Sequence, residues 1–401
     1  MQLNKGALPI PKTLFPFIWH FLKEHKKVVL LYIILCLLAG FWGPINSLLI
    51  KQLIDLLPNA NDGNVSSLLL PAGLIVLNFI IFDNVTWRSI NFIWAKYVPI
   101  IQNKIISSMT DYSLRHSHGF YQNNLSGKIS KQITNLSDSI VTIITFKIAN
   151  FLRCGSLLIA AFITSYFAHQ VFCIILVCWF IIFAGFSISM SSKIVSMSDN
   201  LAEEETKVSG EIVDSLSNHS NIKLFGRLKY EQSRIIPILD NMGERYSALY
   251  IYSNIIYIVQ GVMIAMMMGF STFFLVYLYG KGLVTTGDFA LILGLCMETG
   301  HMIWYLMGEI DEFNKAYGKC KQTLISLIIP LEIEDKPNAS CLNCKEGKIK
   351  FESVEFHYKG TEALFQNKSI EIKAGQKVGL VGYSGSGKST FVNLILRLYD
   401  V

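Results

Sequence analysis

The residues with the clearest capacity for chemistry lie near the carboxyl end of the chain, at Gly382–Ser389. The stretch reads GYSGSGKS and fits the pattern G-x-x-x-x-G-K-S/T of a phosphate-binding loop. Lys377–Val381 predicts a short buried strand before it, and Thr390–Leu398 predicts the start of an apolar-faced helix after it. An accidental glycine turn is the alternative, but this strand-loop-helix setting is the one that a phosphate-binding loop requires.

The residue types in this loop suit an anion. Three glycines let the backbone bend so that N–H groups and the helix N-terminus point at a polyphosphate. Lys388 would reach the terminal phosphates, and the Ser389 hydroxyl would hold Mg²⁺. The sequence therefore predicts a nucleotide-binding site. Its candidate residues are Gly382, Tyr383, Ser384, Gly385, Ser386, Gly387, Lys388, Ser389 and Thr390.

The rest of the composition is that of a membrane protein. Of 401 residues, 52% are hydrophobic and 16% are charged, and the mean hydropathy is +0.42, far more apolar than a soluble protein. The formal net charge of +6 raises the possibility of nucleic acid, but the basic residues are spread between apolar blocks, so we expect no nucleic-acid partner. Most of the 8 cysteines lie in apolar stretches, and no disulfide framework is predicted.

Six apolar runs have the length and composition of membrane-spanning helices, which can satisfy their own backbone groups inside lipid. The runs are Val28–Ile50, Ser66–Trp87, Ile148–Phe167, Val171–Met190, Tyr252–Tyr279 and Phe289–Met307. Residues 1–27 form a basic segment in which Leu14–Leu22 predicts a helix lying in the membrane interface. A signal peptide is the competing interpretation of this segment, but the following apolar run is too long for one.

The links between the runs alternate in length. The short links have Lys51 and Lys281 as almost their only basic residues, whereas the two long links hold many. The positive-inside bias therefore places both long links, both chain ends and the phosphate-binding loop in the cytoplasm. The long links keep helix-forming residues, which predicts cytoplasmic legs with turns at 115–127 and 218–226. A pair of solvated loops is the alternative.

A soluble domain is expected after the last run. Residues 321–348 are polar and contain Pro330 and Pro337, as in a linker. Ile349–Phe356 alternates like a strand, and Ser369–Ile372 is a further short strand candidate. We therefore expect a membrane domain over 28–320, a linker over 321–348 and a nucleotide domain over 349–401.

Taken together these features resemble the half-size ABC exporters of the multidrug and lipid-flippase type. Beyond the phosphate-binding loop, the likeness includes Val354–Tyr358 at the start of the soluble domain and three weaker motifs upstream of it. The weaker motifs are Gly119-Phe120-Tyr121 followed by Gly127-Lys128-Ile129, Asn221–Gly226, and Thr286-Gly287-Asp288. The resemblance covers essentially the whole chain, and it implies a six-helix exporter membrane domain followed by the first part of a P-loop α/β domain.

The resemblance also implies a mechanism. It makes Tyr358 the aromatic residue that stacks on adenine, although an ordinary strand aromatic is the alternative. It makes ATP and Mg²⁺ the cofactors and the turns in the two long links the coupling helices. It further implies a second half-transporter, most simply a homodimer in the plasma membrane, and a small hydrophobic or amphipathic molecule or a lipid as the exported substrate.

The chain departs from the family pattern after the loop. Residues 390–401 alone follow Ser389, where the family continues with a glutamine loop, a signature motif, an acidic strand and a switch histidine. We assign no catalytic residue and expect a C-terminally truncated chain with little ATP turnover of its own. The alternatives are a non-hydrolysing nucleotide-binding membrane subunit and an inactive remnant.

Ionisable residues in the apolar runs are candidates for buried pairing or for substrate contact, because charge is costly at membrane depth. They are Asp83, Arg153, Glu298 and His301. The methionine-rich run 263–268 would be an adaptable lining if it faced a cavity, and otherwise faces lipid or the core. Cys341 and Cys344 have the spacing of half a zinc site or of a redox pair, but no second pair occurs at a fixed spacing and the segment is a linker, so we interpret them as incidental.

Overall fold

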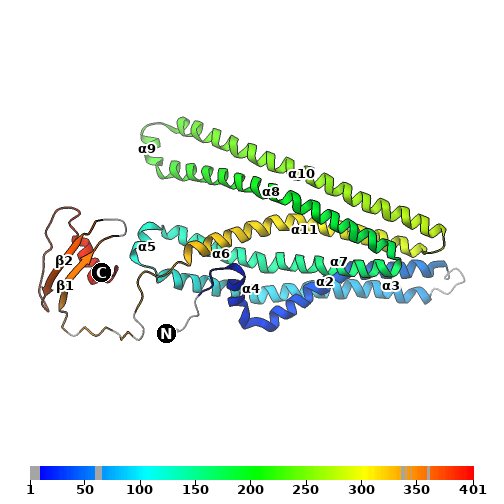
Figure 1. The fold of residues 1–401 in the computed structure, drawn as a ribbon, viewed down its shortest axis with the longest axis horizontal. Coiled ribbons are helices and arrows are strands. Elements are labelled where there is room, and N and C mark those ends of the chain that lie inside the picture. The colour runs from blue at the N-terminus through cyan, green and yellow to red at the C-terminus, as the bar shows by residue number, and fades with distance from the viewer. Residues whose placement is uncertain (1–9, 59–65, 336–338, 341, 345, 359–361) are drawn as a thin grey trace. The chain divides into compact units, whose positions relative to one another are not determined.

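A computed structural model describes residues 10–58, 66–335, 339–340, 342–344, 346–358 and 362–401. Within these ranges six helical segments are long and apolar enough to cross a membrane, and each of the six predicted runs lies inside one of them. The segments are Leu14–Leu56, Ser66–Leu114, Ser126–Ala168, Gln170–Ser217, Leu228–Gly280 and Thr286–Leu327. The chain is therefore a multi-pass membrane protein, and the mainly α fold class is confirmed (Figure 1).

The elements follow one another in the order labelled in Figure 1. The first half contains α1 (Leu14–Leu22), η1 (Lys23–His25), α2 (Lys26–Leu56), α3 (Ser66–Asn78), η3 (Phe79–Val85), α4 (Thr86–Leu114), α5 (His118–Asn123), α6 (Ser126–Thr142), η4 (Ile143–Lys147) and α7 (Ile148–Ala168). The second half contains α8 (Gln170–Ser217), α9 (His219–Leu224), α10 (Leu228–Gly280), α11 (Thr286–Leu327), β1 (Ile349–Phe356), β2 (Phe365–Ile372) and α12 (Lys388–Ile395).

The chain divides into two compact units. One unit contains residues 25–97 and 142–315, and the other contains residues 1–24, 98–141 and 316–401. In the first unit α2 packs against α3 and α7, while α8 packs against α10. Small residues allow the close approaches: a Cβ on Gly40 of α2 would overlap backbone and side-chain atoms of α7. Membrane helices commonly associate through such small residues. The hydrophobic effect does not drive their association in lipid, so close van der Waals packing of the helices must do so.

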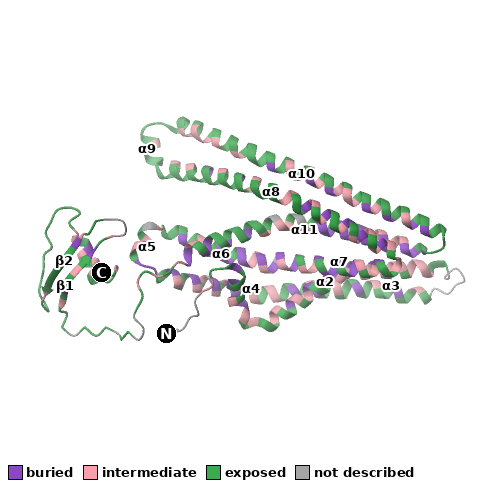
Figure 2. Cartoon of the chain, viewed as in Figure 1, coloured by how far each residue is buried: buried purple, intermediate pink, exposed green. Residues whose placement is uncertain are grey.

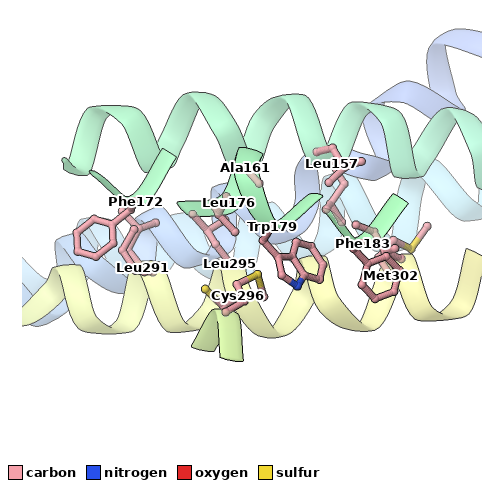
Figure 3. Close-up of a cluster of buried hydrophobic side chains, with 14 of the residues drawn as sticks. Leu157, Ala161, Phe172, Leu176, Trp179, Phe183, Leu291, Leu295, Cys296 and Met302 are labelled. Carbon is pink, nitrogen blue, oxygen red and sulfur yellow. The ribbon is translucent and has the colours of Figure 1, made fainter. Parts of the chain in front are cut away.

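The core of this unit is a cluster of apolar side chains from α7, α8, α10 and α11. Figure 3 shows Phe172, Trp179 and Phe183 of α8 pointing toward α11, where Leu295 and Met302 meet them. The indole of Trp179 donates to the Met263 carbonyl oxygen (3.1 Å), which satisfies its N–H inside the apolar core. The methionine-rich run lies partly in this core, since Met267 is buried, and partly outside it, since Met266 is exposed.

Two helical stretches, η3 and η4, wind as π-helix, a geometry that displaces backbone carbonyls from their usual partners. Side chains satisfy the displaced groups. The Tyr32 hydroxyl of α2 donates to the carbonyl oxygens of Ile144 and Thr145 in η4 (3.0 and 2.9 Å). The Thr86 hydroxyl donates to the Ile81 carbonyl oxygen in η3 (2.9 Å). Hydrogen bonds of this kind compensate the irregular backbone.

The two long links are helical, as the sequence predicts, and each contains a short helix at its predicted turn. Helices α8 and α10 run antiparallel and are joined by α9 (Figure 1). Figure 2 shows that both become mainly exposed toward α9. Helix α5 occupies the turn in the first link, and the residue before it, Ser117, caps its N-terminus: the Ser117 hydroxyl accepts from the Phe120 N–H (3.3 Å).

The second unit contains α1, which has the predicted bounds, and the soluble segment. Strands β1 and β2 pair antiparallel, with irregular register between Phe351 and Phe356. Helix α12 ends at Ile395, three residues short of the predicted Leu398. The predicted strand Lys377–Val381 is wrong: the segment has no regular secondary structure, and Val381 is 98% exposed. A strand needs neighbours to accept and donate its backbone hydrogen bonds, and β1 and β2 pair with each other instead.

Candidate functional site

The loop Gly382–Ser389 has the backbone of an anion cradle. Gly385 and Gly387 have φ of 83° and 89°, in the left-handed region that favours glycine. A Cβ on Gly382 would lie 2.6 Å from the Ser386 Oγ, so the tight turn also requires glycine there. The first helical hydrogen bond of α12 runs from the Phe391 N–H to the Gly387 carbonyl oxygen (2.8 Å). The N–H groups before Phe391 at this helix start precede the helical ladder and are suited to an anion.

Lys388 lies at the start of α12 and arches back over the loop. Its Nζ donates to the carbonyl oxygens of Gly382 (2.9 Å) and Tyr383 (2.7 Å) and to the Ser386 Oγ (3.4 Å). The ammonium group is thereby held above the concave side of the loop. Ser389 is exposed at the helix start, and Tyr383 is 92% exposed. The donor set of this loop therefore fits a polyphosphate.

Aromatic packing holds the loop and α12 on the small sheet. The rings of Phe351 in β1 and Phe391 in α12 stack with centroids 4.4 Å apart. A Cβ on Gly387 would lie 3.0 Å from the Phe365 ring of β2. These contacts fix the loop next to β1 and β2. They also leave no room for a side chain at position 387.

Tyr358 and Thr390 are brought together, although 32 residues separate them in the sequence. Their hydroxyl oxygens are 2.8 Å apart, within hydrogen-bonding distance. Thr390 is buried, and the Tyr358 ring packs edge-on against Phe356 (5.1 Å) and Tyr399 (5.3 Å). The predicted adenine-stacking residue is thus fixed beside the helix that carries Lys388.

Tyr399 is a functional candidate that the sequence did not reveal. Its hydroxyl donates to the Gln122 Oε1 of α5 (2.9 Å), and its ring lies 6.0 Å from that of His118. Burial and the neighbouring Tyr358 raise the pKa of Tyr399, so its hydroxyl keeps its proton and remains a donor at neutral pH. Tyr399 therefore joins the candidate nucleotide site to the short helix in the first long link.

The four ionisable residues that the sequence singles out in the apolar runs lie in two places. Glu298 and His301 share a cavity of about 620 Å³ with Met268 and Trp304. Glu298 lies within electrostatic range of Arg153, whose guanidinium also lies over the Trp87 ring (5.5 Å). These three charged or polar residues therefore belong to one region between α4, α7 and α11, whereas Asp83 lies apart from them in η3.

A second buried cluster, which the sequence did not reveal, surrounds Lys147. Its side chain is 3% exposed, and its Nζ contacts the carboxylates of Glu309 (2.8 Å) and Glu312 (2.6 Å). The Asn150 amide also donates to Glu309 (3.0 Å). This cluster ties η4 and α7 to α11. Two features of the sequence could have indicated this cluster. One is a lysine beside an apolar run, and the other is a pair of glutamates three residues apart in α11.

Of the predicted cysteine pair, Cys341 lies outside the described residues. Cys344 is exposed, and like the other cysteines within the described ranges it forms no disulfide.

Comparison with known proteins gives consistent matches. Residues 29–299 match the family described as ABC transporter transmembrane region, and residues 365–401 match the family described as ABC transporter. An uncharacterized ABC transporter ATP-binding protein of Haemophilus influenzae is 25% identical over 97% of the chain and 64% of its own length. An ATP-dependent lipid A-core flippase of the same species is 26% identical over 96% of the chain and 65% of its own length.

A solved structure of a bacterial Atm1-family ABC exporter with ATP bound has a TM-score of 0.76 to the chain, with 19% identity. It covers 94% of this chain and 66% of the other. The likeness shows a shared fold. The chain thus spans about two thirds of the length of these relatives.

Proposed function

Because the chain belongs to the ABC transporter family through its transmembrane region, we propose that it uses MgATP to export a hydrophobic or amphipathic molecule, or a lipid, across the membrane. The observation that carries this proposal is the cradle of Gly382–Ser389, with Lys388 held above it, on the same chain as six membrane-spanning segments. ATP binding at such a loop is a source of free energy, and the helices are the part that it can move.

The proposed roles follow from the site geometry. Backbone N–H groups of the loop bind the phosphate oxygens, and Lys388 exchanges its loop carbonyl contacts for the terminal phosphates. The Ser389 hydroxyl would hold Mg²⁺, which would neutralise negative charge on the phosphates when bound. Tyr358 stacks on the adenine ring while Thr390 fixes its hydroxyl. The positive φ values of Gly385 and Gly387 support this assignment, since they aim backbone N–H groups into one concavity.

We further propose that α5 and α9 act as coupling helices between nucleotide binding and the membrane. The contact of Tyr399 with Gln122 supports this role for α5. The long links and the nucleotide domain (349–401) would then lie in the cytoplasm, with the membrane domain (28–320) in the plasma membrane and a linker (321–348) between. A second half-transporter, most simply another copy of this chain, would complete the passage.

The substrate class is proposed from the membrane cavity and the relatives. Two relatives are named for the transport of a lipid or for export, and the lining of the cavity around Glu298 and His301 combines apolar side chains with few polar ones. A hydrophobic or amphipathic substrate suits that lining, because the transfer of apolar surface from water to an apolar cavity lowers the free energy.

Inside-out membrane vesicles provide the test. Because ATP turnover is expected to require the remainder of the nucleotide domain, vesicles are made from cells that carry the full-length transporter containing this chain, the same transporter with Lys388→Ala, or no copy. The movement of a fluorescent amphiphile to the vesicle lumen is then followed with and without ATP. The proposal expects ATP-dependent uptake with the wild type and background uptake with the other two. Equal uptake in all three preparations, or uptake that ignores ATP, would contradict it.

A further inference from the structure

The second half of α2 runs along the first half of α11, and the residues that meet there are small or charged. Four of them recur every four positions along one face of α2: Gly43, Ser47, Lys51 and Asp55. A Cβ on Gly43 would overlap the Glu298 carboxylate of α11, and a Cβ on Gly294 would lie 2.8 Å from the Ser47 hydroxyl. We call this line of contacts the α2–α11 seam.

An ion pair closes one end of the seam. The Lys51 ammonium group donates to the Asp288 carboxylate of α11, and the Asp55 carboxylate accepts from the Gly287 N–H (2.9 Å). The side chain of Asp288 is 4% exposed and that of Lys51 is 22% exposed. A Cβ on Gly287 would lie 2.5 Å from the Lys51 carbonyl oxygen, so the two backbones approach each other as closely as a glycine allows.

The ion pair lies at the end of the helices away from α9. Helix α10 leads from α9 to a turn over residues 281–285, and α11 begins directly after that turn. Figure 1 shows the start of α11 at the same end of the helices as the end of α2. The seam is therefore closed at the end opposite to α9, which is proposed above as a coupling helix.

The ion pair can break without leaving a charge unpaired. Asp288 forms a reciprocal cap with Thr285: its carboxylate accepts from the Thr285 N–H (2.8 Å) and hydroxyl (3.1 Å), while its own N–H donates to the Thr285 hydroxyl (3.3 Å). The Lys51 Nζ lies 3.8 Å from the Asp55 carboxylate, one turn on in its own helix. Each charged group therefore keeps a partner on its own side of the seam, which removes most of the cost of separating a buried pair.

We propose that Lys51 and Asp288 form a latch that holds the α2–α11 seam closed, and that α2 and α11 separate at this end when the latch breaks. The seam suits reversible separation, because Gly43, Ser47 and Gly294 meet α11 or α2 without large side chains that interlock. The part of this opening in substrate release rests on the export function proposed above.

Cysteine labelling tests the latch without transport. Ser47→Cys places a thiol of similar size in the seam, where Ser47 is 6% exposed. A water-soluble maleimide is added to the full-length transporter containing this chain, in lipid nanodiscs, and modification at position 47 is followed by mass spectrometry. We expect slow labelling that becomes about 2- to 10-fold faster with Lys51→Met, as the loss of one hydrogen bond implies. Asp288→Asn should act in the same direction.

Two controls separate an open latch from a damaged fold. Lys281→Met removes a lysine at the same end of the helices, where the ammonium group lies over the Tyr277 ring (4.3 Å) and outside the seam. This variant should leave the labelling rate at position 47 unchanged. Cys36, on α2 and 1% exposed, reports the fold, and it should stay unlabelled in every variant.

A disulfide across the seam tests whether transport needs the opening. A Cβ on Gly294 would lie 3.5 Å from the Ser47 Cβ, within the range of about 3.5–4.5 Å that a disulfide requires. In the vesicle assay, the oxidised double variant Ser47→Cys/Gly294→Cys should bind MgATP like the wild type and lose ATP-dependent uptake, which dithiothreitol should restore. Ser47→Cys alone, oxidised in the same way, should keep its uptake.

Equal labelling rates at position 47 with Lys51 and with Lys51→Met would overturn the latch. Full uptake by the oxidised double variant would overturn the opening of the seam during transport. A wild-type transporter without ATP-dependent uptake would contradict the proposed export function instead, and the labelling rates would still decide whether the latch exists.

Discussion

The hydroxyl of Tyr399 donates to the Oε1 of Gln122 across 277 residues of sequence, at a distance of 2.9 Å. Tyr399 follows the helix that begins with Lys388, and Gln122 lies in α5, in the first long link between membrane helices. The Tyr399 ring also packs against Tyr358, the residue proposed to stack on adenine. A continuous set of contacts therefore joins the nucleotide site to α5.

Tyr399→Phe tests this connection. The variant loses the hydrogen bond to Gln122 and keeps the ring that packs against Tyr358. A hydrogen bond of this kind contributes about 0.5–1.5 kcal/mol, so ATP-dependent uptake should fall about 2- to 10-fold while the dissociation constant for MgATP stays within about twofold. Vesicle uptake at saturating ATP and ATP titration measure the two quantities. The double variant with Gln122→Ala should show no further loss, and additive losses would count against a direct contact.

Tyr358→Ala should weaken the binding of ATP and leave the binding of inorganic triphosphate unchanged. Stacking of a base on an aromatic ring contributes about 1–3 kcal/mol, which corresponds to about 5- to 150-fold in affinity. Tyr358→Phe keeps the ring and loses the contact with Thr390, so it is the matched control and should cost much less. Equal losses for ATP and triphosphate in Tyr358→Ala would instead indicate a structural role.

The buried cluster around Lys147 should respond differently to its two glutamates. The side chain of Glu309 is 13% exposed and that of Glu312 is 67% exposed. Breaking a buried pair costs about 3–5 kcal/mol, whereas an exposed pair contributes about 0–1 kcal/mol. Glu309→Gln should therefore lower the midpoint of thermal unfolding in detergent far more than Glu312→Gln. Similar shifts for both variants would show that the cluster is not buried.

Gly40→Ala should destabilise the packing of α2 on α7, since the added methyl group would overlap the Arg153 carbonyl oxygen and the Ser156 hydroxyl. Overpacking of this kind costs about 1–3 kcal/mol. Gly73→Ala is the matched control in α3, because a Cβ there meets nothing within 4 Å. That control should be neutral or stabilising by up to about 1 kcal/mol, as alanine favours a helix interior. The midpoints of thermal unfolding of both variants in detergent test this prediction, and an equal midpoint for Gly40→Ala and Gly73→Ala would contradict it.

Local sequence patterns predicted most of the helices and strands. The length and composition of each apolar run predicted all six membrane helices, and alternation predicted β1 with its observed bounds. The strand predicted at Lys377–Val381 failed because a short apolar run does not report which segment pairs with it. Helix α12 ended early since Arg397, with φ of 51°, breaks the helical backbone at a position that no capping glycine marks.

The sequence alone could not predict contacts between residues that are far apart in the chain. Glycine spacing identified the loop, because the loop is local, but Tyr399 and Gln122 meet only after folding. The same holds for Lys147 and Glu309, which are 162 residues apart.

The central claim is that Gly382–Ser389 grips the phosphate tail of MgATP, with Lys388 as its cation. Titration of MgATP into the purified full chain measures this directly for the wild type, Lys388→Ala and the control Lys373→Ala, which lies outside the loop in the same domain. Charge-assisted hydrogen bonds contribute about 1.5–3 kcal/mol each. We predict that Lys388→Ala weakens MgATP binding by at least about 10-fold and that Lys373→Ala leaves it unchanged. Equal dissociation constants for the wild type and Lys388→Ala would contradict the account.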